Sequence, residues 1–409
     1  MNNAILPDSR YHSRLGWQML GWLLMAQILV ALVGRGVAPL SPLIAEDLTL
    51  TNAQVGLLPS ALFAGQMLVS IPSGLLVDKM GTKKLLFIVC LLLGLSYSAA
   101  SLFSSYFVIL LCIVIGGMAY GTMHPVTNRG ILYWFPQRQR GTAMGIKQMG
   151  ITLGSALAAA ALLPLAAVWG WRPALLAACL VLIGAGALSY LNYKENPLQK
   201  KESVSEPASI LHQIMEVAKS RSLVLISIVA FIINGSQMSL NVYILFYVGN
   251  ELLFGLGIAG TMFVLSEAGG SFGRIVWGTV SDKFFGGRRA PVMFILTLMA
   301  FAGSLSMLLL TPETPVWVLA VVIFLLGFAV SGFNGLWMNI ATELTPPQTA
   351  GLASGFSLTI GSMGVIIIPP VFGWIADLNQ SFTASWMFMA AVMAAAVFFL
   401  GLLRRRRSF

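Results

Sequence analysis

Long apolar segments follow one another almost without interruption from residue 15 to residue 403. A helix needs about 20 apolar residues to cross the ~30 Å hydrocarbon core of a bilayer. By that measure the chain holds twelve candidate spans, at residues 15–38, 53–76, 84–104, 106–134, 141–168, 171–193, 222–248, 256–280, 290–310, 315–342, 349–375 and 381–403. The sequence therefore predicts an all-α membrane protein that crosses the bilayer many times.

The composition supports this prediction. Of the 409 residues, 57% are hydrophobic and 9% charged, whereas a typical soluble domain carries about 25% charged residues. The net charge is +10, but a nucleic-acid-binding protein gathers its basic residues on one solvated face. Here most of them lie in short loops between apolar segments. We therefore expect the protein to lie in a lipid bilayer and not to bind nucleic acid.

The three cysteines lie inside apolar segments, at Cys90, Cys112 and Cys179. Their spacing matches neither a metal site nor a disulfide framework. We read them as small buried apolar residues, and we expect no metal and no cofactor.

A polar stretch at residues 194–220 follows the sixth span and divides the chain into two parts. We predict an N-terminal six-helix bundle at 1–193, a cytoplasmic linker at 194–220 and a C-terminal six-helix bundle at 221–409. The two parts resemble each other. "PQRQRGTAMG" at 136–145 returns as "PPQTAGLASG" at 346–355, an offset of 210. This pattern indicates a duplicated unit whose two copies cross the membrane in the same direction.

The loops that carry lysine and arginine alternate along the chain with loops that carry acidic residues. Short cytoplasmic loops carry an excess of lysine and arginine. Both termini are therefore predicted to be cytoplasmic, with the protein in the bacterial inner (plasma) membrane.

Two loops share a pattern, "GLLVDKMGTKK" at 74–84 and "GTVSDKFFGGRR" at 278–289. The chain here resembles the major facilitator superfamily, whose loop between the second and third helices runs G-x-x-x-D-[RK]-x-G-[RK]-[RK]. Each copy fits that pattern with one extra residue. The resemblance implies twelve transmembrane helices in two pseudo-symmetric halves, and a substrate site between the halves near the midplane.

We predict that these two loops gate the cytoplasmic side. Glycine lets neighbouring backbones approach, and the aspartate can cap a helix end or pair with a base on the facing element. The predicted gating residues are Gly74, Asp78 and Lys79 in the first loop and Gly278, Asp282 and Lys283 in the second. The alternative is that the basic residues of these loops serve only to orient the protein.

Four basic residues and one well-placed acid lie within the predicted spans: Arg35, Arg129, Lys147, Arg274 and Glu267. A charge at mid-helix costs roughly 2.5 to 3.5 kcal/mol, so each needs a partner or a wet cavity. The excess of positive charge favours an anionic substrate bound by the four bases. Glu267 lies seven residues before Arg274, on the same helix face, and is predicted to exchange a proton. Alternatives are a counter-ion role for Glu267, a structural pairing for Arg129 at the cytoplasmic rim, and an Arg35 that extends to the outer interface.

Polar residues recur at helical spacing within three other spans. The seventh span carries Asn234, Gln237 and Asn241, the fourth carries His124 and Asn128 near Tyr120, and the tenth carries Ser331 and Asn334. Such stripes line cavities or form hydrogen bonds between helices. We include His124, Asn128, Asn234, Gln237 and Asn334 among the candidate substrate-binding residues.

Two further resemblances point to organic anions. "GRIVWGTVSDK" at 273–283 is similar to the eighth helix of monocarboxylate and oxalate/formate transporters, which implies that Arg274 binds carboxylate. "NRGILYWFPQRQRGTAMG" at 128–145 is similar to the organic-anion symporters, whose fourth helix also carries an arginine, here Arg129.

No motif in the chain indicates an enzyme. A nucleotide-binding G-x-x-x-x-G-K-[ST] motif and a catalytic pattern such as H-E-x-x-H are both absent from the sequence. We predict a monomeric secondary active transporter that moves a small organic anion, a carboxylate, by alternating access with proton coupling. The alternative is efflux of drugs or other small molecules, for which interior aromatic residues and an excess of acids over bases would be expected.

Overall fold

The protein is described here by a computed structural model that covers residues 9–70, 72–195, 219–345 and 350–406, and within these ranges it contains helices and no strand. The first half comprises α1 (Ser9–Leu48), α2 (Asn52–Val69), α3 (Pro72–Met80), α4 (Thr82–Leu102), α5 (Tyr106–Trp134), α6 (Gln137–Leu157), the π-helix η1 (Ala158–Leu162), α7 (Leu163–Trp169) and α8 (Trp171–Asn192). The second comprises α10 (Arg221–Phe246), the π-helix η2 (Tyr247–Glu251), α11 (Gly255–Phe284), α12 (Arg289–Ser306), the 3-10 helix η3 (Met307–Leu309), α13 (Val316–Val330), α14 (Asn334–Glu343), α15 (Ala350–Asn379) and α16 (Thr383–Arg406).

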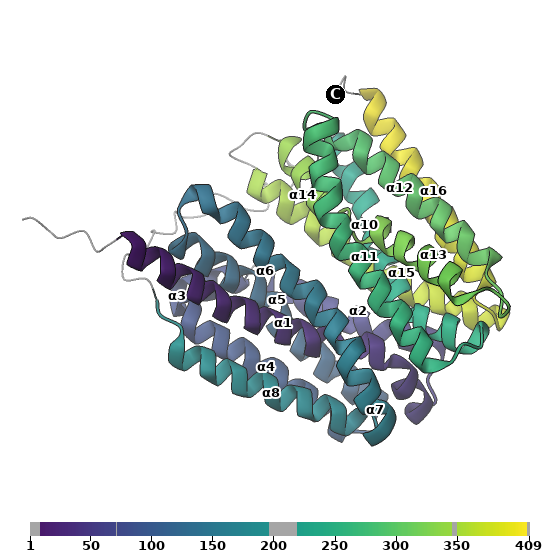
Figure 1. Ribbon diagram of the computed structural model, residues 1–409, viewed down its shortest axis with the longest axis horizontal. Coiled ribbons are helices and arrows are strands. Elements are labelled where there is room, and N and C mark those ends of the chain that lie inside the picture. The colour runs from purple at the N-terminus through teal and green to yellow at the C-terminus, as the bar shows by residue number, and fades with distance from the viewer. Residues whose placement is uncertain (1–8, 71, 196–218, 346–349, 407–409) are drawn as a thin grey trace, which may run out of the picture.

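These helices form the twelve predicted spans, six in each half (Figure 1). Within the described ranges, ten helical stretches are long and apolar enough to cross a membrane. The other two spans are α2 with α3, and α11, where polar residues such as Glu267 and Arg274 lower the hydropathy. Each half surrounds its own apolar core, although a few residues of α1, α2 and η1 also pack into the second core. Most of the predicted linker, residues 194–220, lies outside the described ranges.

The first span differs most from its prediction, because α1 continues ten residues beyond residue 38 and contains Pro39 and Pro42. Proline removes one backbone hydrogen bond inside a helix. For Pro42 the freed acceptor is the carbonyl of Ala38, and the Ser41 hydroxyl donates to it at 2.7 Å. A local side-chain donor therefore lets the helix run through Pro42 and beyond residue 38, where the span was predicted to end.

Glycines bring the second and fourth spans of each half into backbone contact. A Cβ on Gly65 of α2 would collide with the carbonyl of Val114 in α5, and one on Gly269 of α11 would collide with the carbonyl of Phe324 in α13. Gly269 lies 204 residues after Gly65, and Phe324 lies 210 residues after Val114. These are the offsets found between the halves in the sequence, so the duplicated unit packs its helices in the same way twice.

The start of α1 and the end of α16 lie at one end of the bundle, which we call the terminal end, and the loops near residues 50, 170, 252, 315 and 380 lie at the opposite end (Figure 1). Exposed tryptophans near the opposite end include Trp169, Trp317 and Trp374, and Trp17 lies near the terminal end. Tryptophan is enriched at both membrane interfaces. This distribution fits a bundle that crosses the bilayer from one end to the other.

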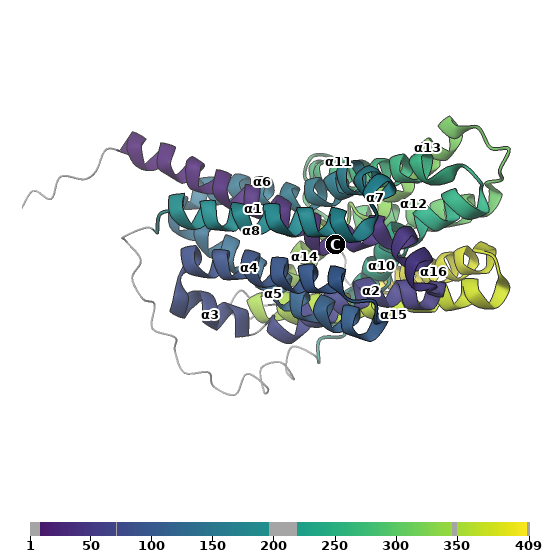
Figure 2. The ribbon, with the colours of Figure 1, turned by 90° about the horizontal axis from the view of Figure 1, so that it is seen from below.

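The two halves are joined most closely at the opposite end, where α2 and α15 lie side by side (Figure 2). Asp377 accepts hydrogen bonds from the Asn52 amide at 2.9 Å, the Asn52 side chain at 2.8 Å and the Ala53 amide at 2.8 Å. A carboxylate at a helix N-terminus is stabilised by the unpaired amides and the helix dipole. Asp377 therefore caps α2 from the other half of the molecule.

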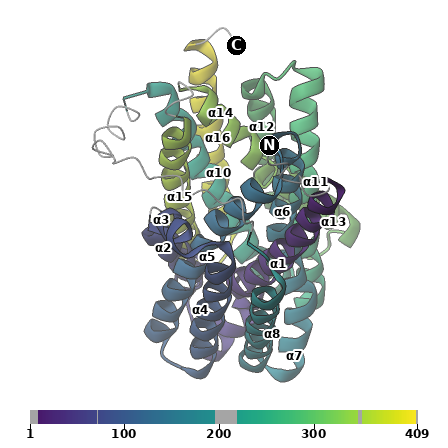
Figure 3. The same cartoon turned by 90° about the vertical axis from the view of Figure 1, so that its left-hand side faces the viewer.

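Two hydroxyl groups strengthen this closure. The Tyr243 hydroxyl lies 2.8 Å from the Asn52 carbonyl and 2.9 Å from the Pro369 carbonyl. Pro370 leaves the carbonyl of Ile366 without its helical donor, and the Ser60 hydroxyl from α2 lies 2.8 Å from that oxygen. The hydrogen bonds from Asp377, Tyr243 and Ser60 join the two halves at this end, and the bond between Ser155 and Glu267 joins them near the middle of the spans. In Figure 3 most ribbons of the first half lie in the lower part of the view and most of those of the second half in the upper part.

Candidate functional site

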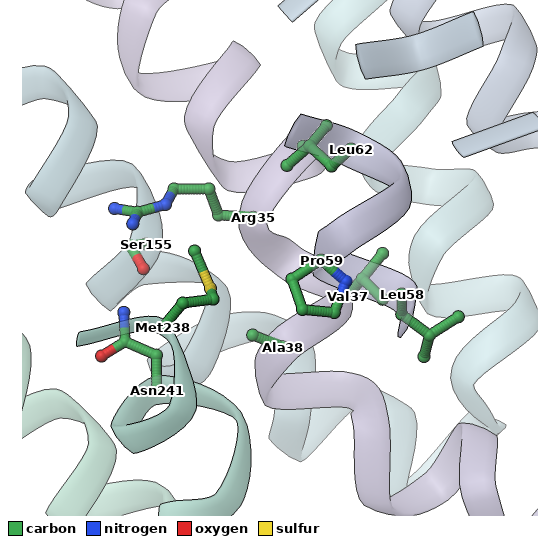
Figure 4. Close-up of a pocket in the computed structure, with 10 residues that line it drawn as sticks. Arg35, Val37, Ala38, Leu58, Pro59, Leu62, Ser155, Met238 and Asn241 are labelled. Carbon is green, nitrogen blue, oxygen red and sulfur yellow. The ribbon is translucent and has the colours of Figure 1, made fainter. Parts of the chain in front are cut away.

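A pocket lies between the two halves and is lined by α1, α2, α6 and α10. Its lining residues are Gly34, Arg35, Val37, Ala38, Leu58, Pro59, Leu62, Ser155, Met238 and Asn241. In Figure 4 the polar side chains Arg35, Ser155 and Asn241 lie toward one side of the pocket, and the apolar side chains Leu58, Pro59 and Leu62 lie toward the other. The pocket therefore has one polar wall, which carries the charge of Arg35, and one apolar wall.

Glu267 of α11 connects the two halves next to this pocket. Its Oε1 accepts a hydrogen bond from the Asn241 side chain at 2.7 Å and one from the Ser155 hydroxyl of the first half at 3.1 Å. The side chain is 1% exposed, and its Oε2 has no hydrogen-bond partner among the described residues. A buried carboxyl oxygen without a partner costs free energy, so Oε2 of Glu267 can accept a hydrogen bond from a ligand.

Arg274 of α11 lies where the tenth span is interrupted. The chain leaves helical geometry at residues 331–333, between α13 and α14. The Arg274 Nε donates to the Ser331 carbonyl at 3.2 Å, and the Asn334 side chain donates to the same oxygen at 3.3 Å. The Gln237 side chain donates to the Ser331 hydroxyl at 2.9 Å. A break in a membrane helix is tolerated where side chains bind the freed backbone groups. Arg274 and Asn334 bind the Ser331 carbonyl in this way, and Gln237 holds the Ser331 side chain.

Tyr120 of α5 lies within electrostatic range of charged residues from both halves. Its side chain interacts electrostatically with Arg35, Glu267 and Arg274, which come from both halves. A Cβ on Gly34 would approach the Tyr120 ring to 2.7 Å. Glycine at the position before Arg35 therefore leaves the space that this ring occupies. We call Arg35, Arg274, Glu267 and Tyr120 the central charge cluster.

Lys147 of α6 forms a second positive position. It is 1% exposed, and its ammonium donates to the Asn128 side chain of α5 at 2.9 Å. His124, one turn before Asn128, interacts electrostatically with both Lys147 and Arg35, and its ring lies 6.5 Å from that of Tyr120. The α5 face with Tyr120, His124 and Asn128 therefore connects the central charge cluster with Lys147.

Arg129 occupies a different environment. Its guanidinium donates to the carbonyl of Val77, near the end of α3, and lies 5.2 Å from the centre of the Tyr133 ring. These contacts hold α3 against α5 close to the terminal end. They favour the structural pairing that the sequence left open, and substrate contact by Arg129 stays a prediction.

The polar stripes serve partly as links between helices. Gln237 and Asn334 both bind Ser331, as described above. Asn234 is partly exposed and lies where α10 passes Gly361 of α15. Ser155, Tyr120 and Ser331 were not among the candidate site residues. Tyr120 and Ser331 belong to stripes visible in the sequence, whereas nothing around Ser155 distinguishes it from other small residues.

The charged gating residues that the structure describes face solvent in this state. Lys79, Asp282 and Lys283 are exposed, and a Cβ on Gly278 would meet no atom within 4 Å. The close approach expected at Gly278 is therefore not a feature of this state. The surroundings of Gly74 and Asp78 in α3 lie outside the described part of the structure, so gating by these residues stays a prediction.

The fold and this site define a polytopic transporter built from a duplicated six-helix unit. The family model of the Major Facilitator Superfamily matches residues 23–311 and 245–408. The chain belongs to this superfamily, and its relatives are named as transporters rather than enzymes.

Three relatives match over most of their length. The "Probable sulfoacetate transporter SauU" of Cupriavidus necator is 24% identical, over 89% of this chain and 88% of the relative. The "Hexuronate transporter" of Bacillus subtilis is 21% identical, over 90% and 89%. The "Probable galactarate/D-glucarate transporter GarP" of Escherichia coli is 23% identical, over 86% of each.

Among solved structures, the nucleoside transporter NupG is similar, with a TM-score of 0.76 and 15% sequence identity. The similarity covers 94% of this chain and 98% of that one. At this identity the likeness shows the fold alone.

Proposed function

We propose that the protein is a secondary active transporter that moves a small organic anion, a carboxylate, by alternating access with proton coupling. The observation that carries the proposal is the central charge cluster, in which two arginines and one buried carboxyl group from both halves meet beside a pocket. The named substrates of the three relatives are all organic acids. An excess of positive charge inside a membrane protein favours such a substrate.

Glu267 is the proposed proton site. It is the acid that contacts both halves near mid-span, through Asn241 and Ser155. Protonation would remove its negative charge from the neighbourhood of Arg35 and Arg274 and leave both arginines free to bind an anion. Binding of the proton and binding of the anion therefore favour each other, which is the thermodynamic requirement for symport.

The distribution of lysine and arginine supports cytoplasmic termini in the inner membrane of a bacterium. In that orientation the opposite end, closed by Asp377, Tyr243 and Ser60, faces outward. The described state then has its outer side shut, and substrate reaches the pocket from the cytoplasm. Outward opening requires the Asp377 bonds to α2 to break.

Asp377→Asn is expected to open the outer side more often. The amide loses the charge-assisted bonds to the α2 amides, a loss of about 1 to 3 kcal/mol, and tenfold in an equilibrium is about 1.4 kcal/mol. The measurement is the rate at which a membrane-impermeant maleimide labels an Ala38→Cys probe in the pocket, in a chain without Cys90, Cys112 and Cys179. We expect about a tenfold faster rate. The exposed Glu313→Gln serves as control, and an unchanged rate in Asp377→Asn contradicts the proposed outer gate.

A thermal-unfolding screen tests the proposed function. A ligand that binds only the folded protein raises its unfolding temperature. The purified protein is screened against carboxylates, sulfonates, phosphates, sugars and lipophilic cations, and we expect stabilisation by a narrow set of organic acids. Stabilisation by lipophilic cations alone would replace this proposal with the efflux alternative.

A further inference from the structure

We propose that the transported anion carries two acidic groups, one bound by Arg35 and Arg274 in the central charge cluster and the other by Lys147. The inference rests on the proposed function and specifies its substrate class. It follows from the number of charges inside the membrane, their partners and their separation along α5.

The positive charges of the site lack sufficient counter-charge. Neither Arg35, Lys147 nor Arg274 forms an ion pair with a carboxylate of the described residues. Glu267 is the acid that interacts electrostatically with the cluster, so the three cations and this acid leave two positive charges uncompensated. A single acidic group on the substrate would neutralise only one of them.

Of the two positions, the burial of Lys147 is the harder to explain without a ligand. Its ammonium has three donors, and the neutral Asn128 side chain is its hydrogen-bond acceptor within the described part of the chain. At 1% exposure this residue is shielded from bulk water. A buried charge without a partner is strongly unfavourable, so an ammonium kept in this position is best explained by a ligand that brings the counter-charge.

The two positions are separate but connected. Tyr120 belongs to the central charge cluster, and Asn128 accepts the hydrogen bond from Lys147. Both residues lie on α5, eight residues apart. At 1.5 Å per residue this is about 12 Å along the helix. His124 lies halfway and interacts with both Lys147 and Arg35. A substrate whose acidic groups are about 6 to 12 Å apart, one to two helical turns, would contact both positions.

The test compares each diacid with its half-amide, which has the same size but one charge fewer. Binding of succinate, adipate and suberate and of their half-amides is measured by calorimetry on the purified full chain. For the best diacid we expect at least about tenfold tighter binding than for its half-amide, since one additional charge-assisted hydrogen bond forms. In Lys147→Met this ratio is expected to fall to about twofold or less.

Two further variants and one stability measurement separate binding from structure. Lys147→Arg keeps the charge and should retain the preference for the diacid, as should the exposed control Lys84→Met. Without ligand, Lys147→Met should unfold at a higher temperature than the native protein, because the unpaired buried charge is gone. The wild-type comparison of diacid and half-amide requires no variant and decides the question even if Lys147→Met does not fold.

The outcomes are distinct. Equal binding of diacid and half-amide by the wild-type protein overturns the two-charge inference and leaves the proposed anion transport standing. An undiminished preference for the diacid in a folded Lys147→Met also overturns it. Absence of binding by every acid in the series, together with no organic acid stabilising the protein in the thermal screen, overturns the proposed function as well.

Discussion

Replacing Glu267 by glutamine is expected to abolish accumulation of the anion driven by a pH gradient, while exchange of internal for external anion continues at about the native rate. Glutamine keeps an oxygen that accepts the bonds from Asn241 and Ser155, so the local structure is preserved. It cannot bind and release a proton, and the link between protonation and anion binding is lost. In proteoliposomes, uptake of the anion identified by the thermal screen should rise only to the external concentration after a pH jump.

Two variants make the Glu267 experiment specific. Ser155→Ala removes a hydrogen bond to Glu267 but keeps the titratable group, so proton-driven accumulation should persist. Glu313→Gln removes an exposed acid far from the site and should change nothing. If Glu267→Gln still accumulates the anion against its gradient on a pH jump alone, the proton is carried by another group.

Replacing Arg274 by lysine is expected to weaken anion binding at least tenfold, although the positive charge remains. The Nε of Arg274 is already bound to the Ser331 carbonyl at 3.2 Å, and the planar guanidinium has further donors for a ligand. Lysine carries one compact ammonium and cannot bind a helix carbonyl and a carboxylate with the same fixed geometry. Loss of one charge-assisted hydrogen bond costs about 1.5 to 3 kcal/mol, and the change is read from the dissociation constant and from the initial rate of uptake.

The matched control is Arg288→Lys in an exposed loop, which should bind the anion as the native protein does. The unfolding temperature of Arg274→Lys without ligand shows whether the break between α13 and α14 is still supported. Near-native binding by a folded Arg274→Lys would assign this arginine to the support of Ser331 alone and remove it from the substrate site.

Several features of the fold followed from local patterns in the sequence. The predicted fourth span, residues 106–134, coincides with α5, and the duplication seen in short loops returns in the packing of Gly65 and Gly269. The first span was predicted to end at residue 38, but α1 continues to Leu48 through Pro42, where Ser41 binds the freed carbonyl of Ala38. A proline inside an apolar segment does not by itself mark the end of a membrane helix.

The candidate site was predicted in part. Spacing on one helix face indicated that Glu267 and Arg274 belong together, and the structure brings them into electrostatic range of each other. The sequence contains no comparable indication that Ser155, 112 residues earlier, binds Glu267. Nor does it show that Arg129 binds the Val77 carbonyl while Lys147 is left with Asn128. These polar residues all lie in apolar spans, and their local sequences do not show which of them bind each other.

The sequence by itself determined the class of structure. The length of an apolar segment, the position of its charges and the repetition of a motif are local properties of the chain. In a bilayer these properties determine which segments cross the membrane and in what order. Only the tertiary structure decided which of the intramembrane charges meet. That depends on the rotation of each helix about its axis and on the contact between two halves, and both are set by packing between residues far apart in the chain, such as Gly65 with Val114 and Asp377 with Asn52.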